Sequence, residues 1–216
     1  MNLFYILGTI FALLIAIDIH ECAHAWTANE LGDPTARYQG RISLNPLVHL
    51  DPMGTMLMVL SAISGFGIGW GKPVPVNPYR LRYGPRLGMG LVAASGPLSN
   101  LLLASVVAVP LRLGLPLPGF ISLLLHAIAT ICIALAVFNL LPIFPLDGHS
   151  VLQGILSTIR ARWAYQASNV LTAMEGPQGA LIFFMLILVD QFLPFSILRL
   201  ILGPPFTLLR RLILGY

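Results

Sequence analysis

The sequence predicts an all-α integral membrane protein with about five full transmembrane helices, a re-entrant or interfacial segment and a short membrane-associated β-hairpin. Two observations favour this class. Of the 216 residues, 57% are hydrophobic and only 9% are charged, and the mean hydropathy is +0.86. This composition is too apolar for a water-soluble domain. Since a helix needs about 20 apolar residues to cross a bilayer, the length allows about five or six membrane segments with short loops.

The first apolar run predicts a membrane helix that carries ionisable residues. It begins near Leu3, continues past Ile19 through an HECAH segment, and ends at Gly32-Asp33-Pro34. The N-terminus lacks the basic region of a secretory signal peptide. We therefore expect this helix to be retained in the mature protein.

Three segments of weaker character follow the first helix. Residues 35–45 alternate weakly around Gly40 and predict an extended hairpin. The run 55–70 is apolar but short and ends in several glycines, which indicates a segment that re-enters the membrane or lies at its interface. Residues 72–86 are rich in proline and basic side chains, as is typical of a loop.

Apolar or amphipathic periodicity predicts the remaining helices. They are 87–113, 120–141, 149–162, and a closing pair at about 179–193 and 195–209. The polar stretch 161–178 separates the last pair from the rest. We therefore divide the chain into a core of residues 1–160 and a C-terminal transmembrane helical hairpin of residues 161–216.

The segment His20-Glu21-Cys22-Ala23-His24 is an HExxH motif on a predicted helix. Two imidazoles one turn apart face the same way, and Glu21 beside them can act on a metal-bound water. This pattern is typical of a zinc site with its own general base. Packing histidines with a snorkelling glutamate are the alternative, which is disfavoured because ionisable groups in a membrane helix need partners or a function.

A catalytic zinc has three protein ligands and one open position, so a third ligand must come from elsewhere. Asp147 follows a predicted span in a segment with two prolines, which would break the helix and turn the carboxylate inward. Asp51 is the main alternative. Asp18 and Glu30 lie too close along the same helix to close the site easily.

An HExxH motif on a transmembrane helix followed by the segment NLLPIFPLDG at 139–148 resembles the site-2 protease family of intramembrane zinc metalloproteases. The similarity is to the compact prokaryotic type without a PDZ or CBS domain, and matching segments lie at 32–35, 40–54, 70–78 and 94–100. The resemblance implies one Zn²⁺ per chain, held by His20, His24 and Asp147. It also implies that Glu21 is the catalytic acid and base.

The resemblance extends to further polar residues. Asn139, Gly40 and Asn100 match positions that the family uses for substrate, and His49 matches a position for a group behind the metal ligands. His149 departs from the family pattern, in which a second small residue often follows Asp-Gly, and is a candidate for a group behind the ligands. His149 is also a candidate extra ligand. Purely structural roles remain open, because Asn139 could cap a helix end, Gly40 could serve a turn, and Asn100 and His49 could be packing groups. His126, alone on an apolar helix, is expected to be structural.

Chain parity and charge predict the orientation. His20 and His24 can meet Asp147 only after an even number of crossings, which the runs 87–113 and 120–141 supply. Most basic residues then fall on the HExxH side, which makes that side cytoplasmic and places the N-terminus outside. The basic residues assigned to that side are Arg37, Arg41, Lys72, Arg80, Arg82, Arg86, Arg160, Arg162, Arg210 and Arg211, whereas Arg112 and Arg199 are assigned to the other.

The sequence thus predicts metal-assisted hydrolysis of peptide bonds in or near transmembrane segments of other proteins. The expected partners are a membrane-embedded helical substrate, the lipid bilayer and a regulatory membrane protein. Nucleic acid is not expected, because the basic residues form no single patch. Two alternatives are a catalytically silent zinc-binding membrane scaffold and a small transporter. Cys22 and Cys132 imply no disulfide framework.

Overall fold

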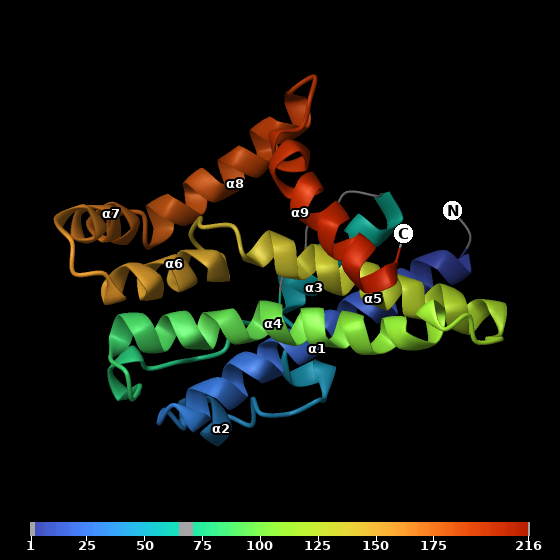
Figure 1. Ribbon diagram of the computed structural model, residues 1–216, viewed down its shortest axis with the longest axis horizontal. Coiled ribbons are helices and arrows are strands. Elements are labelled where there is room, and N and C mark those ends of the chain that lie inside the picture. The colour runs from blue at the N-terminus through green and yellow to red at the C-terminus, as the bar shows by residue number, and fades with distance from the viewer. Residues whose placement is uncertain (1–2, 65–70, 216) are drawn as a thin grey trace.

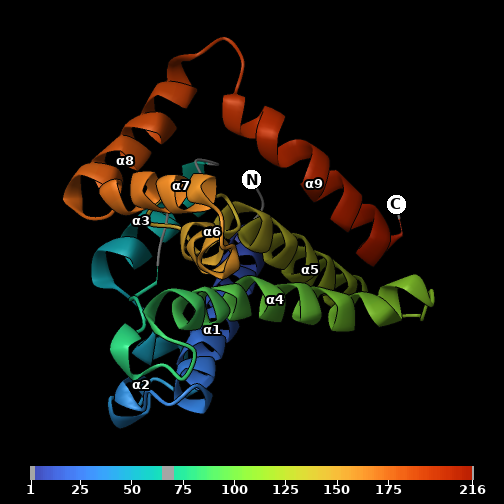
Figure 2. The ribbon, with the colours of Figure 1, turned by 60° about the vertical axis from the view of Figure 1, so that its left-hand side comes forward.

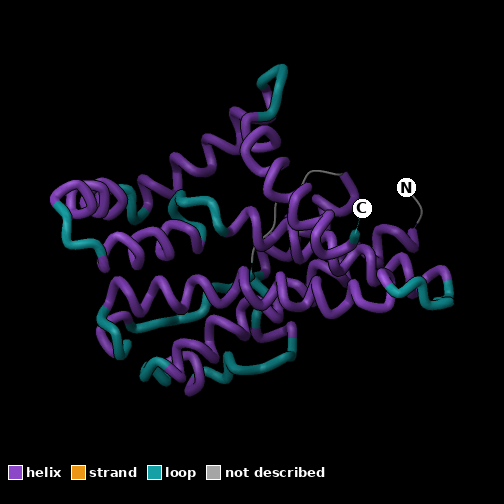
Figure 3. The backbone as a smooth tube through the Cα atoms, in the orientation of Figure 1, coloured by secondary structure: helices purple, strands orange, loops and turns teal. Residues whose placement is uncertain are grey.

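A computed structural model describes residues 3–64 and 71–215 of the chain, and these residues are helical with no β-strand (Figures 1 and 3). The α-helices are α1 (Leu3–Glu30), α2 (Thr35–Tyr38), α3 (Pro52–Ser64), α4 (Pro85–Arg112), α5 (Gly119–Asn139), α6 (Asp147–Thr158), α7 (Arg162–Ala173), α8 (Pro177–Phe192) and α9 (Ile197–Leu214). Two short 3₁₀ helices, η1 (Pro46–Val48) and η2 (Pro78–Arg80), lie in the loops.

Three helices are long and apolar enough to cross a membrane, and the chain is accordingly a membrane protein. The candidate spans are Tyr5–Glu30, Pro85–Arg112 and Gly119–Asn139, within α1, α4 and α5. They pack together as the body of the molecule (Figures 1 and 2). The two later spans lie where the sequence predicts them. The prediction of about five full spans is not confirmed: the described residues contain three such helices, or four if the bent pair Arg162–Ala173 and Pro177–Phe192 forms one span.

Small side chains bring the three spans together. Ala12, Ala16, Ala104 and Ala129 are almost completely buried where α1, α4 and α5 meet. In lipid there is little hydrophobic driving force between helices, so close approach of small residues supplies the packing. Cys132 is buried in the same cluster, in keeping with a role as apolar filler.

The β-hairpin predicted for residues 35–45 is not formed. Thr35–Tyr38 is a single helical turn, and Gly40 ends it with a φ of +67°. The reason lies in Asp33, whose Oδ1 accepts hydrogen bonds from both the backbone N–H and the hydroxyl of Thr35. These bonds initiate a helical turn instead of an extended strand.

The predicted re-entrant run 55–70 is only partly described. Its first part belongs to α3, whose 13 residues span about 20 Å and are too short to cross a bilayer core of about 30 Å. Residues 65–70 lie outside the described part of the chain. Where description resumes, Gly71 forms an isolated antiparallel bridge with Leu50.

The C-terminal helices α8 and α9 form an inverted V over α5 (Figures 1 and 2). Near its start, α9 places Leu198 in a cluster with Leu141 at the end of α5. At its other end, the carbonyl oxygen of Leu212 accepts a hydrogen bond from Arg112, the last residue of α4. The helix α9 therefore runs antiparallel to α5.

This direction corrects part of the predicted charge distribution. Arg210 and Arg211 were expected on the HExxH side, but the end of α9 lies beside the end of α4, at the opposite end of the bundle. Arg199 lies near the start of α9 and so away from that opposite end. The prediction was wrong because it treated α8 and α9 as a hairpin that crosses and returns.

Candidate metal centre

The helix α1 presents both motif histidines on one side. His20 and His24 are one turn apart, their ring centroids lie 4.6 Å apart in an edge-to-face arrangement, and both side chains are buried. This follows from helical periodicity, which places residues i and i+4 one above the other. The motif therefore supplies two imidazoles that share one target point.

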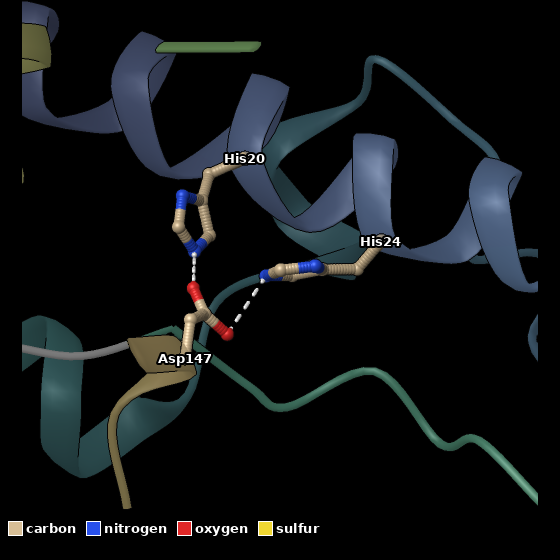
Figure 4. Close-up of side chains that lie close together, drawn as sticks. All are labelled: His20, His24 and Asp147. Carbon is tan, nitrogen blue, oxygen red and sulfur yellow. Dashed lines mark ion pairs between the residues drawn. The ribbon is translucent and has the colours of Figure 1, made fainter. Parts of the chain in front are cut away.

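Asp147 faces these imidazoles from α6. The Nε2 atom of His20 lies 3.0 Å from Oδ2 of Asp147, and Nε2 of His24 lies 3.4 Å from Oδ1 (Figure 4). The three potential ligand atoms all lie within 4.8 Å of one another. Two helices that are far apart in sequence thus bring two nitrogens and a carboxylate to one point.

The local chain turns the Asp147 carboxylate inward. Helix α5 ends at Asn139, and α6 begins at Asp147 after a turn that contains two prolines. Gly148 permits this turn, because a Cβ there would lie 2.2 Å from the carbonyl oxygen of Leu140. A side chain at residue 148 would therefore push the ligand-bearing end of α6 away from α5.

Both histidines are held through the other ring nitrogen. Nδ1 of His24 lies 2.8 Å from the carbonyl oxygen of Val92, so the ring donates N–H there and leaves the lone pair of Nε2 towards Asp147. Nδ1 of His20 lies 3.2 Å from the side-chain nitrogen of Asn100, which is fully buried. Such contacts fix the orientation of metal-binding imidazoles.

Gly96 of α4 completes the site by having no side chain. A Cβ at this position would lie 2.5 Å from Nε2 of His24 and 2.7 Å from Cε1 of His20. The α4 backbone can therefore lie directly against both rings. A methyl group at residue 96 would occupy the space in which the imidazoles meet.

The donor set fits a zinc ion. The carboxylate oxygen of Asp147 and the Nε2 lone pair of His24 are both acceptors and face each other at 3.4 Å, which is unfavourable unless a proton or a cation lies between them. Oδ2 of Asp147 is buried and has no well-aligned hydrogen-bond donor within the described chain. Two imidazoles and one carboxylate with an open position form a familiar catalytic zinc set.

Glu21 lies next to the loop that resumes after residue 70. A Cβ on Gly71 would come within 3.4 Å of Oε1 of Glu21. The buried guanidinium of Arg41 holds this loop by donating to the carbonyl oxygens of Val48, Lys72 and Pro73. The backbone of Gly71 and Lys72 thus forms one wall beside the predicted general base.

The other acidic candidates lie in different surroundings. Asp51 accepts a hydrogen bond from the N–H of Gly54 at the start of α3. Asp18 lies 3.5 Å from Nε2 of His49, which is itself 3.0 Å from the carbonyl oxygen of Ser43. Among the described residues, the group that could hold a metal ion is His20, His24 and Asp147, and neither Asp51 nor Asp18 belongs to it.

The remaining predicted site residues are dispersed. Asn139 donates to the carbonyl oxygen of Leu135 at the end of α5, and Gly40 lies in the exposed turn after α2. His149 lies 3.2 Å from Glu175, outside the metal-binding group. His126 contacts the carbonyl oxygen of Ser122. Asn100, for which we predicted a substrate contact, lies behind His20.

Two features of the site were missed in the sequence. Gly96 belongs to a recognised segment, but a glycine in an apolar helix gives no indication of which side chains it faces. Arg41 was used only as a topology marker, although its burial beside the Gly71 loop shows a structural role. The sequence indicates this role for Arg41 only through its neighbours, since it lies between Gly40 and the apolar Ile42.

The chain is similar to known proteins. The sequence model of peptidase family M50 matches residues 117–185. A protein of Bacillus subtilis (strain 168) named "Putative zinc metalloprotease YwhC" is 39% identical over 155 residues, which cover 68% of each chain. Rip2 of Mycobacterium tuberculosis, named in the same way, is 31% identical over 143 residues.

The aligned part covers 65% of this chain and 54% of Rip2, so the match spans about half of that relative. No solved structure shows significant similarity. The identity and coverage of the Bacillus subtilis relative are sufficient to assign the family. The chain belongs to peptidase family M50, the site-2 protease family of metalloendopeptidases.

Proposed function

We propose that this chain is an intramembrane zinc metalloprotease that cleaves peptide bonds in or near transmembrane segments of other membrane proteins. The observation that carries the proposal is the meeting of His20, His24 and Asp147 on α1 and α6, with Glu21 next to His20 on the same helix. A metal-binding scaffold would need the three ligands but would not need this glutamate. The intact HExxH motif therefore favours hydrolysis.

Each residue has a distinct role in this proposal. His20, His24 and Asp147 would hold the ion, which supplies a Lewis acid for a water molecule and a substrate carbonyl when bound. Glu21 accepts the proton from the attacking water and passes it to the leaving amine. The Gly71 to Pro73 loop forms the wall next to Glu21, beside which an unwound substrate segment could lie.

We further infer that Asn100 orients His20 through its amide oxygen. In the structure Oδ1 of Asn100 is buried without a partner in the described part of the chain, while Nδ2 faces Nδ1 of His20. A half turn of the amide exchanges the two groups in nearly the same space. Oδ1 then accepts from Nδ1–H of His20, and the Nε2 lone pair becomes available to zinc.

The site lies well inside the predicted membrane core. His20 is ten residues before Glu30, which places it about 15 Å from the end of α1. Water must therefore reach it along a polar path from the nearer end. A substrate helix must also unwind locally, because a helical backbone is already hydrogen-bonded. We propose that the substrates have helix-destabilising residues near the cleaved bond.

We propose a multi-pass location in the cell membrane, with the site facing the cytoplasm and the N-terminus outside. Basic residues remain concentrated at the end of the bundle nearer the site, even after Arg210 and Arg211 are moved to the other end. The positive-inside rule favours a cytoplasmic position for this end. Reporter fusions at both termini test this orientation, and both termini are expected outside.

The experiment compares the wild type with Glu21→Gln, both purified as full chains in detergent. Zinc content per chain is measured, and cleavage of single-helix membrane proteins is followed with and without a chelator. We expect about one zinc in both proteins and chelator-sensitive cleavage in the wild type alone, with a loss of about 10²- to 10⁴-fold in the variant.

Three outcomes would contradict the proposal. Absence of bound zinc would remove the metal site and favour the transporter. Zinc in both proteins with equal cleavage would remove Glu21 from the chemistry. Zinc in both with no cleavage of a panel that includes helices with internal proline or glycine would favour the silent scaffold.

A further inference from the structure

The helix α6 has two faces with different tasks. Successive residues advance by about 100° around a helix, so His149 lies about 200° and Gln153 about 240° from Asp147, whereas Gly154 returns to within about 20° of Asp147. Gly154 packs closely on Gly90 of α4. One face of α6 therefore contacts the bundle and carries Asp147, and the opposite face carries His149 and Gln153.

This opposite face is held by a cluster of polar side chains, of which His149, Gln153 and Ser168 are buried. We use the name α6 clamp for His149, Gln153, Ser168, Thr172 and Glu175. Nε2 of His149 lies 3.2 Å from Oε1 of Glu175, and Nε2 of Gln153 donates to the same oxygen at 2.8 Å. Residues 149 and 153 are one turn apart on α6. Two successive turns are thus tied to a single carboxylate oxygen.

The clamp continues onto α7. Oε1 of Gln153 accepts a hydrogen bond of 2.9 Å from the hydroxyl of Ser168, and Nε2 of Gln153 contacts the hydroxyl of Thr172 at 3.1 Å. Both ends of the Gln153 amide are therefore satisfied by α7 or by the residues that follow it. Such bonds favour one rotational position, because an alternative would leave the buried amide of Gln153 unpaired.

The rotation of α6 decides where Asp147 points. Asp147 is the first residue of α6, only two residues before His149, and its carboxylate must meet two imidazoles within 4.8 Å. A rotation of α6 by one residue would turn that carboxylate by about 100° away from α1. On the face that packs on α4, Gly90 and Gly154 lie in close backbone contact, so a rotation would also bring a larger side chain of α6 against α4 there.

We propose that Glu175 and Gln153 are positioning residues that lock α6 at the rotation in which Asp147 completes the metal site. This inference rests on the proposed function, because it assumes that the three ligands hold zinc. Glu175 is well suited to the role, since it precedes α8 and its half-exposed side chain reaches inward to α6. Neither residue touches the reacting atoms.

The test measures metal binding by the full chain in detergent, with zinc and cobalt as probes. Zinc affinity is obtained by competition with a chromophoric chelator, and the visible absorption of the cobalt form reports ligand geometry. The variants are Glu175→Ala, which removes the shared acceptor, and Gln153→Leu, which removes the donor. Glu175→Gln is the rescue variant because its amide oxygen can accept both hydrogen bonds.

We expect Glu175→Ala and Gln153→Leu to weaken zinc binding about 10-fold or more and to shift the cobalt bands, as removal of groups behind metal ligands commonly does. Glu175→Gln should resemble the wild type. Glu30→Ala is the control, because Glu30 is also an exposed glutamate near a helix end and contacts only Asn29 among its described hydrogen bonds. It should change neither quantity.

Wild-type zinc affinity and an unshifted cobalt spectrum in both Glu175→Ala and Gln153→Leu would overturn the inference while leaving the proposed function intact. An equal loss in Glu30→Ala would also overturn it, since the effect would then follow any lost surface charge. A wild type that binds no zinc would overturn the proposed function and this inference together.

Discussion

The two ends of the helical bundle are held together by different means. In the part of the bundle away from the metal site, which begins about one helical turn from His20, Ala12, Ala16, Ala104 and Ala129 allow α1, α4 and α5 to touch along apolar surfaces. At the site end α1 and α4 are joined by polar contacts, those of His24 with the Val92 carbonyl and of His20 with Asn100.

The difference shows how one bundle combines stability with a polar site. The packing of small residues in lipid does not depend on which side chains form the metal site. The end distant from the site can therefore stabilise the fold without taking part in the chemistry. Buried polar groups need partners, so each histidine at the site end has a second group behind it. Substitutions at the two ends should therefore affect different measurable quantities.

The largest effect is expected from removal of the third ligand. Asp147→Ala should weaken zinc binding by more than about 100-fold and abolish cleavage, because it removes a ligand itself, whereas loss of a group behind a ligand costs about 10- to 100-fold. Asp51→Ala is the control, since Asp51 caps α3 and lies outside the metal-binding group. Equal zinc loss in both variants would exclude the assignment of Asp147.

Gly96→Ala should have the next largest effect. The new Cβ would lie 2.5 Å from Nε2 of His24, so the imidazoles or α4 must move. We expect a loss of about 10- to 100-fold in zinc affinity, measured by chelator competition. Gly203→Ala on α9 makes the same change where a Cβ meets nothing within 4 Å. The prediction fails if the two variants bind zinc equally well.

A substitution at the distant end should separate stability from metal binding. Ala108→Leu inserts three carbons into the buried contact of the spans and should lower the free energy of unfolding by about 1–3 kcal/mol. Zinc affinity should remain unchanged. Ala134→Leu, on an exposed position of α5, is the control for side-chain size. A lowered zinc affinity in Ala108→Leu would show that the ends are coupled.

The smallest effect is expected at Asp33, which ties the end of α1 to the loop that forms the site wall. Its Oδ2 accepts a 2.6 Å hydrogen bond from the N–H of Asn77. Asp33→Asn replaces one carboxylate oxygen by an amide donor and should lower the free energy of unfolding by about 1 kcal/mol. Hydrogen exchange at the Asn77 amide should become faster, with little change in zinc affinity.

The stabilisation that Asp33 contributes to the fold should also depend on pH. Burial would raise the pKa of Asp33, but hydrogen bonds from Thr35 and Asn77 outweigh it and hold the pKa below its ordinary value. The stabilisation is therefore full above about pH 4 and is lost as the pH falls through the lowered pKa. The difference in unfolding temperature between wild type and Asp33→Asn should shrink below about pH 4. A constant difference would contradict this account.

Local spacing made part of the molecule predictable. The partnership of His20 and His24 follows from helical periodicity within five residues, and α4 and α5 follow from long apolar runs. Asp147 was harder to predict as a ligand. Its position beside the two histidines depends on a turn after a membrane span and on the return of the chain to the depth of His20 and His24. Periodicity alone left both Asp147 and Asp51 as candidates for the third metal ligand, and the resemblance to a known family favoured Asp147.

Features that depend on distant contacts were not predictable. The direction of α9 depends on its contacts with α4 and α5, so Arg210 and Arg211 were placed at the wrong end. The prediction of a β-hairpin at residues 35–45 was wrong because the Asp33 side chain initiates a helical turn there. Glu175 and Gln153 are 22 residues apart in sequence and meet only when α7 folds against α6.

The most direct test of the central claim is zinc-edge X-ray absorption of the purified full chain. The account predicts a first coordination sphere of nitrogen and oxygen at about 2.0–2.1 Å with two imidazoles, and the loss of an oxygen donor in Asp147→Ala. A sulfur ligand at about 2.3 Å, which would implicate Cys22 within the motif, or an identical spectrum in Asp147→Ala would contradict it.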